Sequence, residues 1–410
     1  MICGFLAALL SIGLFELGAF KGLDAALARF LGRPSPPIVE RGLQYFLMLL
    51  LAFGISWTTV DLGSLPLKVG VAFTALAETI TAAWVLNLFG VYFSPFAGIF
   101  ATLTAFILSL VYSQTDAGGR KHTLQQLLGD RVSSNTFTAM LDSDAPLNFE
   151  GEVREATIVV CEIINHEELL ATLRTDNYVA MTNSFLQNAA DLLVQHGGYL
   201  DECDGESLRV LFGAPLRNPD HASRACNATL ELSTKLEAVN RECVSAWGKM
   251  FDYRIGINSG EVIIAAYGSR RLGALSVSGE PVEFTRRLCS ANEIYNTRTL
   301  IGARTFALAE ESIEVRPMEL IQRHPGKGHR EEVYELIAHK DRLSEPQRAR
   351  RDLYWKGVVY FREHLPDKAL ATFREIRDKY GADGAVDFYI RRIEQMQKGL
   401  PSLDWDTARL

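Results

Sequence analysis

Four long apolar runs in the first 115 residues constrain the fold more than any other feature of this sequence. They cover about residues 3–20, 43–60, 69–92 and 95–113. Their apolar side chains are continuous, whereas an amphipathic helix of a soluble protein carries a single apolar stripe. Because a bilayer core requires about 20 apolar residues per helix, we predict a membrane region with four transmembrane helices.

The charged residues are distributed unequally along the chain. Residues 1–115 contain five basic and five acidic residues, whereas the whole chain contains 42 Lys and Arg against 49 Asp and Glu, a net charge of −7. The entire negative surplus therefore lies after residue 115. This excludes a single soluble globule, and it excludes a protein built to bind nucleic acid, which needs a basic surface. The six cysteines form no CxxC pair, which is typical of reduced thiols in a cytoplasm.

The orientation of the membrane region is open to two interpretations. The positive-inside rule places the loop 21–41, with its four basic residues, in the cytoplasm, whereas four spans followed by a cytoplasmic C-terminal part place it outside. We expect the second, a multi-pass protein of the cytoplasmic (inner) membrane with its C-terminal part in the cytoplasm. A cleaved signal peptide at 1–20 is the alternative for the first run, but a basic n-region is absent and further spans follow. Glu78 lies inside a predicted span, where an ionisable residue indicates sensing, coupling or a hydrogen bond between helices.

The polar part of the chain alternates short strands with helical stretches. A run of β-branched residues at 154–164 predicts a buried strand, and 197–215 predicts a hairpin with a tight Asp-Gly turn. Residues 253–268 predict two short strands around Ser259, and 276–288 predict a strand, a turn and a helix. The order β-α-β-β-α-β predicts an α+β fold with a ferredoxin-like split βαβ core.

Helical segments flank this core on both sides. Leucines at helical spacing predict a connecting helix over 118–141, through which parallel copies of the chain could pair. After the core, the spacing W-x-G-x₂-Y-x₈-A-x₃-F from Trp355 to Phe373 resembles one tetratricopeptide-type helical hairpin. Such repeats need about three copies to be stable alone, so we expect the hairpin to pack on the preceding domain or on a dimer partner.

A series of ordered motifs runs through the core: Glu162-Ile163 at a strand end, Gly197-Gly198 and Gly205-Glu206 in the hairpin, GINSGEV at 256–262, SGEPVEFTRRL at 278–288 and VYELI at 333–337. In this order the motifs resemble those of the class III nucleotidyl cyclases, the adenylate and guanylate cyclases. The apolar N-terminal part resembles, more weakly, bacterial receptor cyclases, with the sensory domain reduced to the loop 21–41. The resemblance implies a membrane region at 1–115, a connecting helix at 116–148, a cyclase-homology domain at 149–340 and a helical tail at 341–410. It also supports the orientation with the C-terminal part in the cytoplasm, because cyclase chemistry needs cytosolic nucleotide.

In that family two carboxylates hold two Mg²⁺ ions. One ion helps to ionise the ribose 3′-hydroxyl that attacks the α-phosphate, and the other holds the triphosphate, as in other two-metal phosphoryl chemistry. The resemblance implies that Glu162, Glu206 and the backbone carbonyl of Ile163 would be the metal ligands. It also implies a site formed between two chains, in a homodimer or with another cyclase-fold chain. Mg²⁺ or Mn²⁺, with ATP or GTP, would bind if the site is active.

Most of the implied site positions depart from the family pattern. Both metal positions carry Glu instead of Asp, the base-selecting Lys position is Glu202 with Ser276 as its partner, and the Asn position that steadies the ribose is Glu283. Arg287 matches the family's catalytic Arg, and we interpret His166, in the triphosphate loop, as a surface residue at a helix start. The changes at 202 and 283 add three negative charges, and one unit charge about 4 Å from a phosphate costs roughly 4 kcal/mol at an effective dielectric constant of about 20.

Three functions therefore remain open from the sequence. The first is a membrane-anchored signalling protein whose degenerate cyclase domain acts as a dimeric transducer or scaffold, its glutamates being solvated or cross-dimer charges. The second is an active adenylate or guanylate cyclase whose glutamates still hold Mg²⁺ or Mn²⁺. The third is a regulator that senses nucleotide. We expect membrane lipid as a partner in each case, and no nucleic acid.

Overall fold

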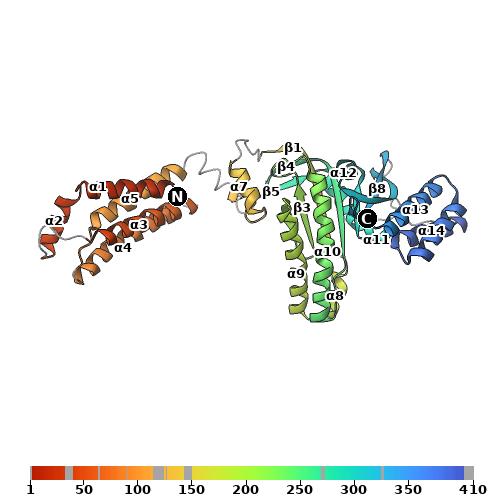
Figure 1. Cartoon of the computed structure of the whole chain (residues 1–410), viewed down its shortest axis with the longest axis horizontal. Helices are drawn as coiled ribbons and strands as arrows, with labels where there is room; N and C mark the ends of the chain where they lie inside the picture. The colour runs from red at the N-terminus through yellow and green to blue at the C-terminus, as the bar shows by residue number, and fades with distance from the viewer. Residues whose placement is uncertain are drawn as a thin grey trace. The chain divides into compact units, whose positions relative to one another are not determined.

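The chain consists of two compact units, Met1–Gln126 and Leu127–Leu410, which we describe separately (Figure 1). The computed structural model describes residues 2–32, 40–62, 65–89, 91–113, 124–125, 127–142, 150–268, 273–324 and 327–400.

The first unit is built from helices. Three of those in the described part, α3 to α5, are long and apolar enough to cross a membrane. The first predicted span differs from expectation, because α1 ends at Glu16 and a second helix follows at an angle of 73°; together they would make a fourth span. The helices are α1 (Ile2–Glu16), α2 (Lys21–Phe30), α3 (Arg41–Asp61), α4 (Leu65–Leu88) and α5 (Pro95–Ser113).

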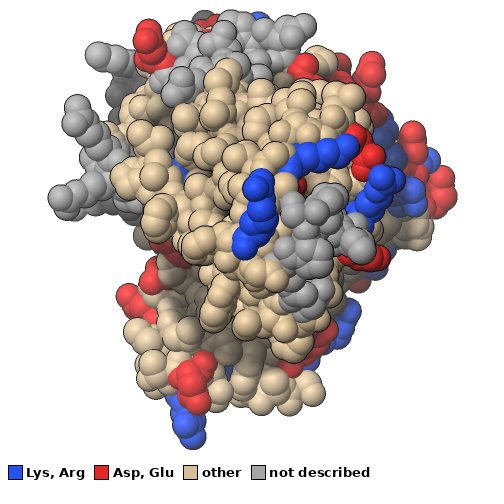
Figure 2. All heavy atoms as spheres, turned by 90° about the vertical axis from the view of Figure 1, so that its left-hand side faces the viewer, with Lys and Arg blue, Asp and Glu red and all other residues tan. Residues whose placement is uncertain are grey.

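The packing of this unit resembles that of membrane helices. Small side chains lie in the interior, where Ala52 and Ala105 are fully buried, and the Ser109 hydroxyl donates a hydrogen bond to Ser56 Oγ at 2.9 Å. Large apolar side chains point outward instead; Trp57 and Phe73 are each 72% exposed. Small residues between helices and apolar residues on the outside are typical of membrane proteins. Figure 2, with the left-hand side of Figure 1 toward the viewer, shows broad uncharged areas interrupted by few Lys or Arg side chains.

The second unit contains one mixed sheet, which confirms the predicted α+β fold. Its strand order is β2-β3-β1-β4-β6-β8-β7, with β5 paired to β4. Among the described strands only the β4–β6 pair is parallel. The strands are β1 (Glu152–Ile163), β2 (Tyr199–Cys203), β3 (Ser207–Phe212), β4 (Tyr253–Gly268), β5 (Gly273–Ser278), β6 (Thr299–Gly302), β7 (Ile313–His324) and β8 (Lys327–His339). The helices are α7 (Ser134–Asp142), α8 (His166–Thr172), α9 (Thr175–Gln195), α10 (His221–Trp247), α11 (Glu280–Tyr295), α12 (Ala303–Ala309), α13 (Glu345–Arg362), α14 (Pro366–Tyr380) and α15 (Gly384–Gln397).

The two short strands predicted around Ser259 are in fact one long strand. β4 pairs with β1 without interruption from Tyr253 to Ile264, so Ser259 and Gly260 lie inside the ladder. A Cβ at Gly260 would lie only 2.7 Å from Pro281 Cγ of α11. The glycine therefore permits a close approach of the helix and does not mark a turn.

The connecting segment also differs from the single helix predicted over 118–141. The backbone turns at Gly129, whose φ is +51°, and a separate helix, α7, begins at Ser134. The intervening residues dock on the edge strand β2: the N–H of Leu200 donates to the Arg131 carbonyl at 2.9 Å, and Arg131 Nη1 donates to the Asp201 carbonyl at 3.1 Å. The start of the predicted helix lies outside the described residues.

The described part of the C-terminal tail, up to residue 400, has three helices instead of the two of a single hairpin. Gly357 of α13 packs against Phe373 of α14, whose ring carbons would lie 2.9 Å from a Cβ at that glycine. Phe373 stacks on Tyr389 of α15, with ring centroids 4.8 Å apart. The same hydrophobic cluster includes Tyr295 of α11 and Met318 of β7. The tail therefore shares a core with the sheet-containing domain, as expected for a repeat too short to stand alone.

Candidate active site

The end of strand β1 brings the first two candidate metal ligands beside the β2–β3 hairpin. Glu162 lies opposite Ser207 of β3 and Arg254 of β4 in the ladder. The N–H of Ile163 donates to the backbone carbonyl of Glu206 at 2.9 Å. This register places the hairpin turn next to the strand end, so the three predicted metal ligands come together as expected from the order of the motifs.

The hairpin turn is closed by a third carboxylate. Asp204 Oδ1 accepts the backbone N–H groups of Glu206 at 3.0 Å and of Ser207 at 2.7 Å. Burial alone would raise the pKa of Asp204, but these donors and the positive charge of Arg286 hold it below its usual value. From the sequence, Asp204 is only the first residue of an Asp-Gly turn; the hydrogen bonds show that it also orients Glu206.

Glu162 experiences a strongly negative environment. Burial raises the pKa of Glu162 above its usual value, and the negative charges of Glu206 and Asp204 raise it further. His166 and Arg254 offset only part of this effect. Carboxylates crowded together at a strand edge favour a bound cation, because a positive charge relieves their mutual repulsion.

The imidazole of His166 contacts two of the three predicted metal ligands. Its Nε2 lies 3.4 Å from Glu206 Oε2, and its Nδ1 lies 3.4 Å from the backbone carbonyl oxygen of Ile163. His166 does begin helix α8, but its side chain is only 29% exposed. The interpretation as a surface residue is therefore incomplete, since the side chain lies against the candidate metal ligands.

The candidate ligands have the donor atoms that a divalent cation needs. Glu162, Glu206 and the Ile163 carbonyl offer oxygen atoms, the donors that Mg²⁺ and Mn²⁺ prefer. However, no group of three or more His, Cys, Asp or Glu side chains is arranged to hold a metal in the described residues. Only two of the predicted ligands, Glu162 and Glu206, are side chains of these kinds, since Ile163 would contribute its backbone carbonyl, and the His166 imidazole lies against two of the three donors. Metal binding here would require His166 to turn away.

The glutamate at the base-selecting position is held by two arginines. Glu202 Oε2 lies 2.7 Å from Arg209 Nη1 and 2.9 Å from Arg286 Nη2. Arg286 also approaches Glu283 Oε1, at 3.9 Å, and Arg209 Nε donates to Asp201 Oδ2 at 2.5 Å. From the sequence, we counted only the three negative charges added at positions 202 and 283. These two arginines compensate part of the added negative charge, so that argument overestimates the repulsion of a triphosphate.

The remaining predicted site residues lie on β5 and α11. Ser276 is on β5, opposite Ala265 of β4, and the Tyr199 hydroxyl of β2 donates to the carbonyl of the preceding Leu275 at 2.5 Å. This bond brings the strand of Ser276 beside the strand of Glu202. Glu283 and Arg287 are four residues apart on α11 and share one helix face; Glu283 is 72% exposed.

Comparison with known proteins agrees with this arrangement. Residues 150–333 match the family model described as the adenylate and guanylate cyclase catalytic domain. This part of the chain belongs to the class III nucleotidyl cyclase family. The cyclase domain thus covers the strands and helices that carry every candidate site residue.

Relatives of the cyclase domain occur in several organisms. Adenylate cyclase 1 of Rhizobium meliloti is 22% identical over 184 residues, covering 45% of this chain and 28% of its own length. An uncharacterized protein of Mycobacterium tuberculosis is 27% identical over 229 residues, or 56% of this chain and 40% of its own length. The crystal structure of the guanylyl cyclase Cya2 is 26% identical, with a TM-score of 0.44, over 48% of this chain and 98% of that one. The chain spans less than half the length of these two curated relatives.

Proposed function

We propose that this protein is a membrane-anchored signalling protein whose cyclase domain is catalytically degenerate and acts as a dimeric transducer or scaffold. One observation carries the proposal: the positions where the family has a donating Lys and Asn carry the carboxylates Glu202 and Glu283. Two of the site carboxylates also contact other side chains of the same chain. Glu206 pairs with His166, and Glu202 pairs with Arg209 and Arg286.

The ion pairs hinder nucleotide binding only weakly, whereas the missing donors affect catalysis strongly. Each exposed ion pair contributes only about 0.2–1 kcal/mol, so a nucleotide could displace them at a small cost. The absent donors matter more, because Glu202 and Glu283 accept hydrogen bonds where the family uses Lys and Asn to donate them. Removing one donor aimed at developing charge typically lowers the rate by about 10²–10³. The Asn position is a loss of this kind, and the Lys position removes the donor that selects the base, so we expect very little turnover.

The proposed dimer and membrane location rest on the family resemblance and on the apolar helices. The family's site forms between two chains, so a homodimer, or a pair with another cyclase-fold chain, would retain that geometry without catalysis. The helices of the first unit that suit a membrane would anchor the protein in the cytoplasmic membrane. The cyclase domain would then lie in the cytoplasm and the loop 21–41 outside.

Measurement of cyclic nucleotide formation by the full-length protein in detergent tests this function. We expect no cyclic AMP or cyclic GMP above background with ATP or GTP, in either Mg²⁺ or Mn²⁺. Metal-dependent product that is lost in Glu162→Ala would overturn the proposal.

An active cyclase is the second candidate, and the crowding of carboxylates favours it. The raised pKa of Glu162, caused by burial and by Glu206 and Asp204, is the state that a divalent cation would relieve. In that case Glu162, Glu206 and Ile163 would hold the Mg²⁺ or Mn²⁺ that supports attack on the nucleotide. Arg287 and Glu283 would then steady the ribose and the developing charge.

A further inference from the structure

A polar cavity of about 430 Å³ lies where the C-terminal tail meets the cyclase domain. Its walls come from the start of β4, the turn between α11 and β6, the strands β7 and β8, and the starts of α13 and α15. None of the predicted site residues lines it. Its volume is within the range of cavities that hold small ligands.

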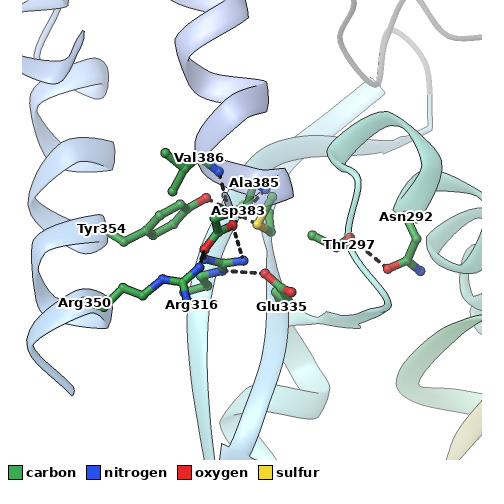
Figure 3. A network of polar contacts seen from close by, with 10 residues as sticks. Asn292, Thr297, Arg316, Glu335, Arg350, Tyr354, Asp383, Ala385 and Val386 are labelled. Atoms are coloured by element: carbon green, nitrogen blue, oxygen red, sulfur yellow. Dashed lines mark hydrogen bonds and ion pairs between the residues drawn. The ribbon is translucent and has the colours of Figure 1, made fainter. Parts of the chain in front are cut away.

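One wall of the cavity is a buried ion network (Figure 3). Asp383 is only 7% exposed and accepts from Arg316 Nη1 at 2.6 Å and Nη2 at 2.9 Å. It also pairs with Arg350 of α13. Arg316 Nε donates to Glu335 at 2.5 Å. Both carboxylates of this wall therefore already have cationic partners.

The arginines of the cavity retain unused hydrogen-bond donors. Arg254 Nη1 and Arg350 Nε are buried and have no hydrogen-bond partner among the described residues. The nearest acidic partner of Arg254 is Glu293, at 3.8 Å, and Arg298 lies 3.6 Å from Glu237. These distances are longer than those of a charge-assisted hydrogen bond.

The described lining of the cavity contains four arginines, Arg254, Arg298, Arg316 and Arg350, and the three carboxylates of Asp252, Glu335 and Asp383. Glu293 and Glu237 lie just outside this lining, near Arg254 and Arg298, so the arginines are not in charge surplus. What favours an anion is instead the buried donors without partners, which are unfavourable and which an anion would satisfy. The planar fork of arginine matches the oxygens of a phosphate group.

We propose that this cavity binds a small anion that carries a phosphate group, held by Arg254, Arg298 and Arg350. The anion would join the tail to the cyclase domain, because Arg350 belongs to α13 whereas Arg254 and Arg298 belong to β4 and the α11–β6 turn. The proposal is independent of whether the domain makes cyclic nucleotide.

The position of Arg254 connects the cavity to the candidate active site. Arg254 is the cross-strand neighbour of Glu162, and Tyr253, which also lines the cavity, is the neighbour of Ile163. An anion bound beside Arg254 would therefore lie on the strand that pairs with the one carrying the candidate metal ligands Glu162 and Ile163.

Titration calorimetry on the full-length protein in detergent tests the proposal, with inorganic phosphate and AMP as probes and chloride at equal ionic strength as the reference. We expect phosphate to bind, and Arg298→Gln to weaken its binding at least about tenfold by removing a charge-assisted contact. The matched control is Arg374→Gln, a similarly exposed arginine of α14 paired with Glu394 at 2.7 Å, which should bind like the wild type. Tighter binding of AMP than of phosphate would identify a nucleotide as the ligand, and equal binding would identify free phosphate.

A second measurement needs no variant. Addition of phosphate to the wild type should slow amide hydrogen exchange at residues 296–298 and at the start of α13. Binding no stronger than that of chloride, or equal binding by wild type and Arg298→Gln, would overturn the proposal. So would phosphate binding that is lost in Arg286→Gln and retained in Arg298→Gln, since that would place the anion at the candidate active site.

Discussion

The Nε2 atom of His166 lies 3.4 Å from the carboxylate Oε2 of Glu206, and the same ring reaches the carbonyl of Ile163. A histidine in the loop that lines the triphosphate in related cyclases thus contacts two candidate metal ligands. Its position three residues after Ile163 follows from the start of α8, and the contact with Glu206 follows from the register of the β2–β3 hairpin. The relationship suggests that His166 competes with metal.

Replacement of His166 by Ala should strengthen Mn²⁺ binding about two- to fivefold, because a partly exposed ion pair contributes at most about 1 kcal/mol. Titration of the full-length protein followed by Mn²⁺ paramagnetic resonance measures the affinity. The matched control is His196→Ala, which removes a similarly exposed imidazole 3.1 Å from Glu231 and should leave the affinity unchanged. Weaker Mn²⁺ binding by His166→Ala would instead make His166 a ligand.

Neutralising the glutamates at the substrate positions should strengthen nucleotide binding. In Glu202→Gln with Glu283→Asn, Arg286 loses the two carboxylates with which it pairs. Arg209 loses Glu202 and keeps Asp201, so Arg286 becomes the more available of the two arginines to phosphate. We expect about tenfold tighter binding of ATP, well below the unscreened Coulomb value because these groups are exposed. Fluorescence titration with a labelled ATP analogue measures this, with Glu168→Gln, which removes an exposed partner of Lys249, as the control. Unchanged affinity would mean that these charges do not face the nucleotide.

Two expectations about the site needed correction: the exposure of His166 and the net charge around Glu202. They show which features a sequence pattern can predict and which it cannot. The strand ending at Ile163 and the hairpin at 197–215 were predictable, since a run of β-branched residues and an Asp-Gly turn are local signals. The pairing of Glu202 with Arg209 and Arg286 was not, because it joins β2, β3 and α11 and depends on their register. For the same reason, the charge argument counted the replaced residues and omitted their neighbours.

Long-range packing explains the other differences. In the sequence, Gly260 looks like a turn residue. In the folded domain a glycine is needed there because Pro281 of α11 packs closely against it. The tail motif predicted two helices from their internal spacing. The third helix docks through Asp383, whose partners Arg316 and Arg350 lie on separate elements.

Substitution of Gly260 by Ala should destabilise the cyclase domain by about 1–3 kcal/mol, the usual cost of overpacking. The new Cβ would lie 2.7 Å from Pro281 Cγ, in the middle of a strand. Gly205→Ala is the control, because a Cβ there meets no atom within 4 Å. Chemical unfolding in detergent measures both, and equal stability of the two variants would contradict the close packing.

Removal of the buried carboxylate of the tail network should loosen the tail. Asp383→Asn leaves Arg316 and Arg350 without their shared partner, and breaking a buried ion pair in this way costs about 3–5 kcal/mol. Asp387→Asn, on the same helix and 3.9 Å from Arg377, should cost far less. Proteolysis of the α14–α15 link measures the docking.

The same network predicts a dependence on pH. Burial alone would raise the pKa of Asp383, but Arg316 and Arg350 hold it below its usual value of 3.8. Its contribution to stability is therefore complete above that value and is lost as the pH falls through the lower folded-state pKa. Burial raises the pKa of Glu335, which acts in the opposite sense, so the difference between wild type and Asp383→Asn is the quantity to measure. That difference should shrink in acid; a constant difference would contradict the charged network.

The rate at which the full-length protein forms cyclic AMP or cyclic GMP tests the central claim most directly. The wild type should give none above background with Mg²⁺ or Mn²⁺, and so should Glu162→Asp with Glu206→Asp, because the Lys and Asn donors remain absent. Further addition of Glu202→Lys and Glu283→Asn should restore nucleotide binding before turnover. Robust product from the unmodified protein, abolished by Glu162→Ala, would contradict the account and establish an active cyclase.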